Sequence, residues 1–164
     1  MKKLIFVCLL LVMLAGCHAP VYETIGNVAH VGQNDAVRRQ ILLTLPDDAT
    51  VLTASGTDLL YACQDYTLSL QTMPAGDLAA TVHTLSGFDA SQLTLLHSCC
   101  NDHDRYDWVW VAAGENGDVL CRGAILDDGD YHYTLCVSAD ADADVTDAWN
   151  ELFRSFCLET DREN

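Results

Sequence analysis

Lysine is absent from this chain after Lys3, and six arginines are the only other strongly basic residues. All 24 aspartates and glutamates lie beyond residue 16, so residues 17–164 carry a formal net charge of −18 (6 − 24). A surface this acidic repels phosphate backbones and anionic lipid headgroups. The composition therefore argues against nucleic acid as a partner and is compatible with basic proteins or divalent cations.

Long apolar segments are also missing. The unbroken apolar run at residues 4–14 has eleven residues, whereas a helix that crosses a bilayer needs about 20. The run follows Lys2 and Lys3 and precedes two small residues, Ala15 and Gly16, as in a secretory signal. We therefore expect residues 1–16 to direct export rather than to span the membrane.

The motif that ends this segment, Leu14-Ala15-Gly16-Cys17, resembles the lipobox of bacterial lipoproteins. The resemblance implies cleavage before Cys17 and a diacylglycerol attached to the Cys17 thiol, with no other cofactor. Two or three acyl chains anchor a protein stably, whereas one is marginal. We expect a lipid-anchored protein on the extracytoplasmic face of the cell membrane. An ordinary secreted protein with a cysteine near the cut is the alternative.

Cleavage before Cys17 leaves 148 of the 164 residues, enough for one domain. The expected organisation is a lipoprotein signal peptide at 1–16, a lipidated cysteine and flexible tether at 17–37, a single α+β domain at 38–158, and an acidic tail at 159–164. Strands are expected at residues 39–45, 59–62, 66–72 and 93–97. A helix is expected at 78–85, with Asp77 as its N-cap and Gly87 as its terminator.

The strongest β signal is a three-stranded antiparallel meander at residues 108–113, 119–126 and 131–137. Two-residue turns at Asn116-Gly117 and Asp128-Gly129 would join the strands. This register places Cys121 directly opposite Cys136 on the neighbouring strand. A disulfide between them would be feasible mainly at a non-hydrogen-bonded pair, where opposed side chains approach most closely. The face predicted to form the core carries Val109, Val111, Ala113, Leu120, Arg122, Ala124, Leu126, Tyr131, Tyr133, Leu135 and Val137. The opposite face carries Trp108 and Trp110, and we expect another element to cover part of it.

A final amphipathic helix is indicated by apolar residues spaced three and four apart from Val145 to Phe156. The segment 149–156, of the form Trp-x-x-Leu-Phe-x-Ser-Phe, resembles the PsbP-like fold of photosystem extrinsic proteins and the bacterial lipoprotein DcrB. Leu43-Thr44-Leu45-Pro46 shares this resemblance. The chain also resembles small lipoproteins of gut anaerobes that carry similar Trp-x-x-Leu-Phe-x-Ser-Phe and Asp-Asp-Gly-x-Tyr-His-Tyr segments, the latter at 127–133 in this sequence. The resemblance implies an α+β fold with an antiparallel sheet between helices and a non-enzymatic accessory role. It transfers no functional residue.

One acidic segment matches part of a calcium loop. Asp140, Asp142, Asp144 and Glu151 occupy the first, third, fifth and twelfth positions of that motif. However, Val145 stands where the motif needs glycine, and a strand rather than a helix precedes it. The competing interpretation is a solvated acidic turn at the start of the last helix.

The cysteines leave the redox chemistry open. Six follow Cys17 without any C-x-x-C spacing: Cys63, Cys99, Cys100, Cys121, Cys136 and Cys157. An exported chain with six cysteines invites disulfides, yet an ordinary apolar fraction does not require them. Cys99-Cys100-x-x-His103 belongs to no zinc motif of the usual spacing.

No catalytic signature is evident. His132, Ser55, Ser86 and the carboxylates of 127–130 lack a nucleophile-elbow or acid–base context and fit sheet and turn positions. We therefore expect a non-catalytic domain that binds an envelope protein or a small ligand. A cation- or metal-binding lipoprotein that uses the acidic loops or the thiols is the alternative, and a hydrolase is the third.

Overall fold

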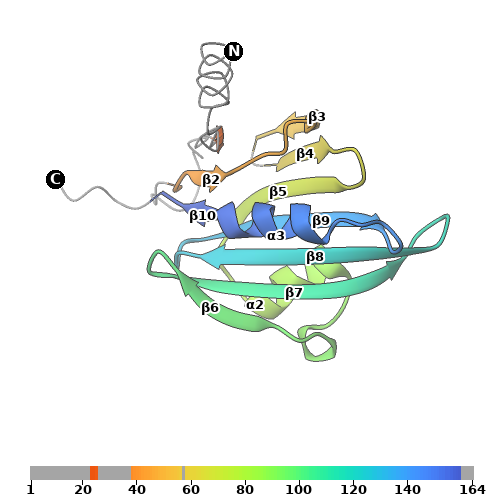
Figure 1. Ribbon diagram of the computed structural model, residues 1–164. Helices are drawn as coiled ribbons and strands as arrows, with labels where there is room; N and C mark the ends of the chain where they lie inside the picture. The colour runs from red at the N-terminus through yellow and green to blue at the C-terminus, as the bar shows by residue number, and fades with distance from the viewer. Residues whose placement is uncertain (1–22, 26–37, 57, 160–164) are drawn as a thin grey trace, which may run out of the picture.

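The computed structural model describes residues 23–25, 38–56 and 58–159 (Figure 1). The expected signal peptide, Cys17, most of the tether and residues 160–164 lie outside the described residues. Among those described, no helix is long and apolar enough to cross a membrane.

A seven-stranded antiparallel sheet forms the centre of the domain, with strand order β3-β4-β5-β9-β8-β7-β6. The strands are β3 (Thr50–Ser55), β4 (Asp58–Ala62), β5 (Thr67–Pro74), β6 (Leu96–Cys100), β7 (His103–Ala113), β8 (Asp118–Asp127) and β9 (Tyr131–Asp140). A second sheet has the order β1-β2-β10, from β1 (Glu23–Ile25), β2 (Ile41–Leu43) and β10 (Cys157–Leu158). Both sheets stay open.

Helices lie on both faces of the large sheet (Figure 1). Helix α3 (Thr146–Ser155) buries Trp149, Leu152 and Phe153 against strands β5, β8 and β9 and the small sheet. Helix α2 (Leu78–Ser86) and the 3₁₀ turn η1 (Ala90–Gln92) lie on the other face, where Val82 joins a second apolar cluster. The predicted antiparallel sheet between helices is confirmed.

The predicted N-cap and terminator of α2 are both confirmed. The Asp77 carboxylate accepts a hydrogen bond of 3.0 Å from the backbone N–H of Ala79, which satisfies one free donor of the first turn. At the other end Gly87 has φ of 76°, and its N–H donates to the carbonyl of His83. This left-handed ending favours glycine, as the sequence predicted.

Four elements differ from the predictions, and one of them is β10, which lies where no strand was expected. The strand expected at 93–97 lies three residues later, as β6, and pairs with β7 across Asn101 and Asp102, both with positive φ as in a type I′ turn. Strand β3 was not predicted, because all of its residues are exposed and none alternates with a buried one. Glu23–Ile25, assigned to the tether, pairs with β2 as a strand.

The predicted meander exists, but its register is wrong by two residues at both hairpins. The first loop has four residues, 114–117, because Ala113 pairs with Asp118. The second turn is centred on Gly129-Asp130, with φ of 90° at Gly129, and not on Asp128-Gly129. Cys121 therefore stands opposite Ser138, and Cys136 stands opposite Gly123.

A shift of two residues preserves which side chains share a face, since strand side chains alternate with a period of two. The predicted core face is therefore buried along most of β8 and β9. Its buried side chains are Ala124, Leu126, Tyr131, Tyr133, Leu135 and Val137. It is not buried along β7, where Val109 and Val111 are 55% and 50% exposed. The tryptophan face is covered by α2, as expected, and Trp108 fits there because Gly123 opposite has no Cβ.

Candidate functional site

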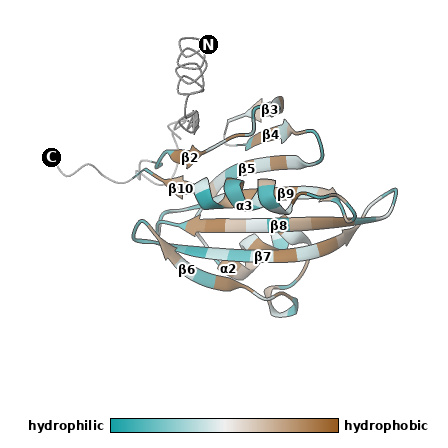
Figure 2. Ribbon diagram, in the orientation of Figure 1, coloured by the Kyte–Doolittle hydropathy of each residue, from teal (hydrophilic) through white to brown (hydrophobic). Residues whose placement is uncertain are grey.

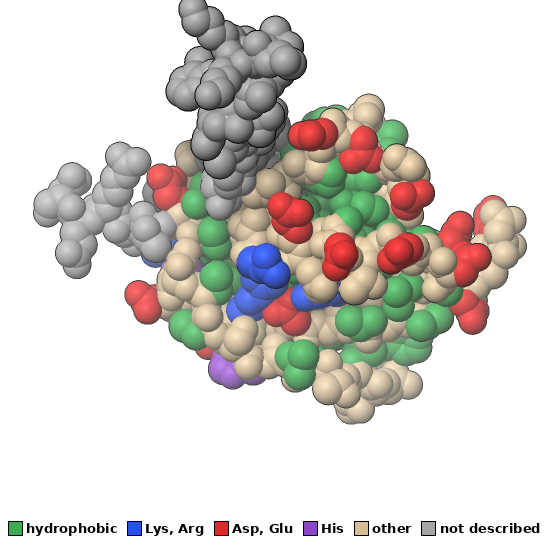
Figure 3. All heavy atoms as spheres, viewed as in Figure 1, with side chains coloured by type: hydrophobic (Ala, Val, Ile, Leu, Met, Phe, Trp, Pro, Cys, Tyr) green, Lys and Arg blue, Asp and Glu red, His purple; other side chains and the backbone are tan. Residues whose placement is uncertain are grey.

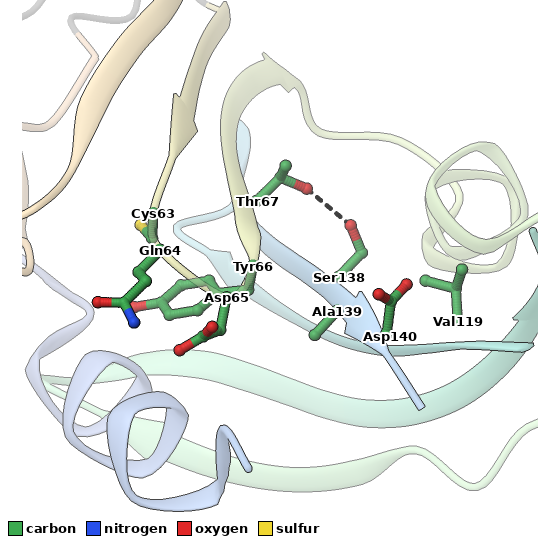
Figure 4. Close-up of a pocket in the computed structure, with 9 residues that line it drawn as sticks. All are labelled: Cys63, Gln64, Asp65, Tyr66, Thr67, Val119, Ser138, Ala139 and Asp140. Carbon is green, nitrogen blue, oxygen red and sulfur yellow. Dashed lines mark hydrogen bonds between the residues drawn. The ribbon is translucent and has the colours of Figure 1, made fainter. Parts of the chain in front are cut away.

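A cavity of about 360 Å³ opens at one end of the large sheet (Figure 4). The turn between β4 and β5 forms one wall, and the end of β9 with the start of β8 forms the other. Its lining residues are Cys63, Gln64, Asp65, Tyr66, Thr67, Val119, Ser138, Ala139 and Asp140.

Backbone pairing holds the two walls in place. Thr67 pairs with Ser138 across β5 and β9, and their hydroxyl oxygens lie 2.7 Å apart (Figure 4). The turn is closed by the N–H of Cys63, which donates to the carbonyl of Tyr66 at 2.9 Å. The Asp48 carboxylate accepts from the N–H of Gln64 and so ties the preceding loop to this turn.

The thiol and the phenol of the cavity remain protonated near neutral pH. Burial raises the pKa of the Cys63 thiol, an effect that a hydrogen bond with Tyr66 partly offsets. Burial also raises the pKa of Tyr66 well above its usual range. The Tyr66 hydroxyl is buried without an oxygen or nitrogen partner, and its ring meets Trp149 of α3 edge-on, with ring centroids 6.2 Å apart. A thiol is a weak nucleophile in its protonated form. These groups are therefore suited to non-covalent contact with a bound molecule rather than to nucleophilic attack on it.

Polar groups in reach of a bound molecule come from both walls. The Asp65 and Asp140 carboxylates are exposed, and Thr67 and Ser138 add hydroxyls. The sequence interpretation missed this site because its two walls are about 70 residues apart in the chain. Two of its lining residues are named by the sequence for other reasons: Asp140 as a candidate calcium ligand and Cys63 as one of six cysteines.

The candidate calcium ligands do not form a binding group. Among the described residues, no cluster of three or more histidine, cysteine or acidic side chains could hold a metal ion. Asp140 ends β9, Asp142 and Asp144 lie in the exposed connection, and Glu151 is exposed on α3. The helix begins after Val145 without a side-chain cap. The segment therefore has the geometry of an acidic turn before a helix.

The six described cysteines are all free thiols. Cys121 and Cys136 lie on neighbouring strands and on one face, as predicted, but diagonally rather than directly opposite. Burial, and to a smaller extent the adjacent Cys121 thiol, raises the pKa of Cys136 to about 12. Cys100 and His103 are paired residues that flank the β6–β7 turn, and Cys99 is exposed.

The side chains of His132, Asp127 and Asp128 have structural partners. His132 is buried on the α2 side, where Nδ1 lies 2.8 Å from the Thr81 hydroxyl and Nε2 lies 3.5 Å from the Asp127 carboxylate. Asp127 accepts from the N–H of Gly129, and Asp128 accepts from the N–H groups of Asp130 and Tyr131. These groups stabilise the β8–β9 turn, in agreement with the sequence interpretation.

Asp128 also has a role that the sequence did not suggest. It accepts a hydrogen bond of 2.9 Å from the Tyr133 hydroxyl, and the Arg39 guanidinium lies 3.6 Å from it. The N–H of Arg39 donates in turn to the Tyr133 oxygen at 2.7 Å. The turn therefore attaches the segment that leads into β2.

No protein-family model matches this chain, and no curated protein matches it. Solved structures do. The solution structure of cyanobacterial PsbP (CyanoP) from Synechocystis superposes with a TM-score of 0.56 at 15% identity, covering 73% of this chain and 86% of that one. A crystal structure of a protein from Bacteroides thetaiotaomicron gives a TM-score of 0.53 at 10% identity, covering 75% of this chain and 46% of that one.

The Ran-binding protein Mog1p of Saccharomyces cerevisiae gives a TM-score of 0.48 at 10% identity, covering 73% of this chain and 90% of that one. The first two likenesses establish the fold that the C-terminal motif suggested. The chain has the PsbP-like α+β fold.

Proposed function

We propose that this chain is a membrane-anchored extracytoplasmic lipoprotein whose PsbP-like domain binds a partner or ligand without catalysing a reaction. The cavity between the β4–β5 turn and the end of β9 carries this proposal. Its thiol and phenol are held in their protonated forms, and its remaining polar side chains are two exposed carboxylates, a pair of hydroxyls and the Gln64 amide. Such a lining offers hydrogen bonds and negative charge to a small polar or cationic ligand.

The fold is compatible with this function, because PsbP-like domains are expected from the resemblance to act as accessory proteins. Fold alone does not determine function, so the proposal depends on the cavity and on the lipobox resemblance. The second function considered from the sequence, a cation-binding lipoprotein, would need ligands brought together by the fold. The described residues contain no such group, and we therefore do not favour it.

Anchoring is tested by changing the lipidated residue. The Cys17→Ser variant should lose labelling by a radioactive or alkynyl fatty acid. It should either remain unprocessed, with the mobility of the precursor, or be released and move to the aqueous phase in Triton X-114 partition. The matched control is Cys99→Ser, which removes an exposed thiol of the domain and should change neither result. Full labelling and detergent partition of the Cys17→Ser protein would refute the anchor.

Binding is tested by thermal-shift screening of small amines, amino acids and sugars against the full-length protein. A ligand of the cavity should raise Tm, and the rise should vanish when Ser138→Leu occupies the cavity wall. Ser55→Leu, at an exposed position of β3, is the control and should retain the shift. Turnover of any of these compounds by the unmodified protein would contradict the non-catalytic assignment.

A further inference from the structure

One face of the large sheet is left partly uncovered. Helix α3 lies over β9 and β8, and the neighbouring strands β7 and β6 extend beyond it (Figure 1). We call the uncovered surface the β7 face. Its apolar residues are Leu96, Val109, Val111, Ala113 and Leu120. Leu96, Val109 and Val111 are 65%, 55% and 50% exposed.

Strand pairing places these side chains on the same side as α3. Val109 stands opposite Arg122, and Val111 stands opposite Leu120. The Arg122 guanidinium lies 4.0 Å from the centre of the Phe153 ring, and it donates to Asn150 of α3 at 3.1 Å. Arg122 therefore marks the border of the helix, and the β7 face begins where its coverage ends.

The hydropathy of β7 changes along its length (Figure 2). Near His103 the strand carries Arg105 and Asp107, whose side chains form a two-point ion pair at 2.7 and 3.0 Å. From Val109 onward the outward side chains are apolar. The Asp107 carboxylate also lies 3.7 Å from Arg122. The charges at this end thus neutralise one another, whereas the apolar end has no described covering element.

Acidic side chains border the apolar end (Figure 3). Asp118 pairs with Ala113 and stands two residues before Leu120, so it shares their face. Asp147 precedes Asn150 by three residues on α3, which places it on the same flank of the helix. Both carboxylates are exposed.

We propose that the β7 face docks a basic amphipathic segment of another protein. The apolar side chains of that segment contact Val109 and Val111, and its lysines or arginines lie near Asp118 and Asp147. An apolar surface bordered by like charges selects a partner of opposite charge. A second copy of this chain would bring like carboxylates together, and an anionic membrane would meet the same repulsion. This inference rests on the proposed function, since it names the partner class of a binding domain.

The test uses the full-length protein in phosphatidylcholine nanodiscs, with empty nanodiscs as the blank. Two short synthetic peptides have leucines at the same positions. One carries lysines at the intervening positions, and the other carries glutamates there. Fluorescence anisotropy should show binding of the lysine peptide only, and the binding should weaken as NaCl increases. In the Val109→Thr/Val111→Thr variant, which keeps side-chain size and strand propensity, Kd should rise about tenfold because two buried methyl groups are lost.

Matched controls separate the β7 face from general acidity. Val51 and Leu52 of β3 are 52% and 56% exposed, so the Val51→Thr/Leu52→Thr variant should leave Kd unchanged. Asp118→Asn should weaken binding several-fold, whereas Asp102→Asn in the β6–β7 turn should have no effect. Equal binding of both peptides, or an unchanged Kd in Val109→Thr/Val111→Thr, would overturn the proposal.

A second measurement does not depend on any variant. A photoreactive derivative of the lysine peptide, cross-linked to the unmodified protein, should label residues 96–100 or 109–113. Labels confined to the cavity would overturn the β7 face while leaving the proposed binding function in place. Sedimentation showing self-association that Val109→Thr/Val111→Thr abolishes would replace the basic partner with a second copy. Full labelling and detergent partition of the Cys17→Ser protein would contradict the proposed anchor without affecting this result.

Discussion

Docking of α3 onto the large sheet is tested by Phe153→Ala. The Phe153 side chain is 1% exposed and packs among Leu152, Phe156 and the strands of the main core. Truncation of a buried phenylalanine costs about 3–5 kcal/mol from lost burial and the remaining cavity. The Arg122 guanidinium over its ring adds about 0.5–1 kcal/mol, because Arg122 is partly exposed and so not fully desolvated. We expect a total loss of about 3.5–6 kcal/mol, comparable to the whole stability of a marginal domain.

The assay is urea denaturation followed by tryptophan fluorescence, since Trp149 of α3 is buried beside Tyr66. Glu151→Ala, an exposed position on the same helix, should change the unfolding free energy by less than about 0.5 kcal/mol. Phe153→Leu should cost only about 1–1.5 kcal/mol, since it keeps most of the apolar volume. It therefore remains measurable if Phe153→Ala does not fold. A loss below about 1 kcal/mol for Phe153→Ala would show that the helix does not pack as described.

Three further predictions concern single sites. Asp77→Ala should destabilise the protein by about 1 kcal/mol in urea denaturation, through loss of the α2 cap, and Asp77→Asn should restore most of it. Gly123→Ala should cost about 1–3 kcal/mol, since its Cβ would lie 2.5 Å from Trp108; an unchanged Tm would contradict this packing. Cys136 should resist iodoacetamide far longer than the exposed Cys99, as mass spectrometry of partly labelled protein will show. Because folding raises the Cys136 pKa from 9.0 to about 12, its contribution to stability is complete below pH 9 and falls as pH rises toward 12. Cys136→Ala should remove that part of the alkaline loss.

The register of the β7–β8 hairpin could not be predicted from its turn residues alone. Asn116-Gly117 is the preferred pair for a two-residue turn, and the prediction followed it. The chain instead forms a four-residue loop, in which the N–H of Gly114 donates to the carbonyl of Gly117 at 2.8 Å. That loop lets Leu120 stand opposite Val111 and Cys121 opposite Trp110. Packing along the whole hairpin therefore outweighs the preference of two turn residues.

The β7 face and the cavity could not be predicted for a related reason. Alternation along β7 correctly placed Val109 and Val111 on the same face of the sheet as the core residues of β8. It could not show that α3 ends its coverage of that face at Arg122. The cavity joins the turn at 63–67 to Ser138 and Asp140 through the pairing of β5 with β9. No periodicity within one segment reports which distant strand becomes its neighbour.

The sequence by itself determined the acidic charge, the limits of α2, the amphipathic face of α3, and the existence of the meander. Each of these depends on interactions within a few residues: a cap, a left-handed glycine, or a spacing of two, three or four. Only the tertiary structure decided the strand order, the register, the cross-strand neighbours of the cysteines and the uncovered end of β7. Those features depend on which surfaces far apart in the chain bury one another, and burial is a property of the assembled fold.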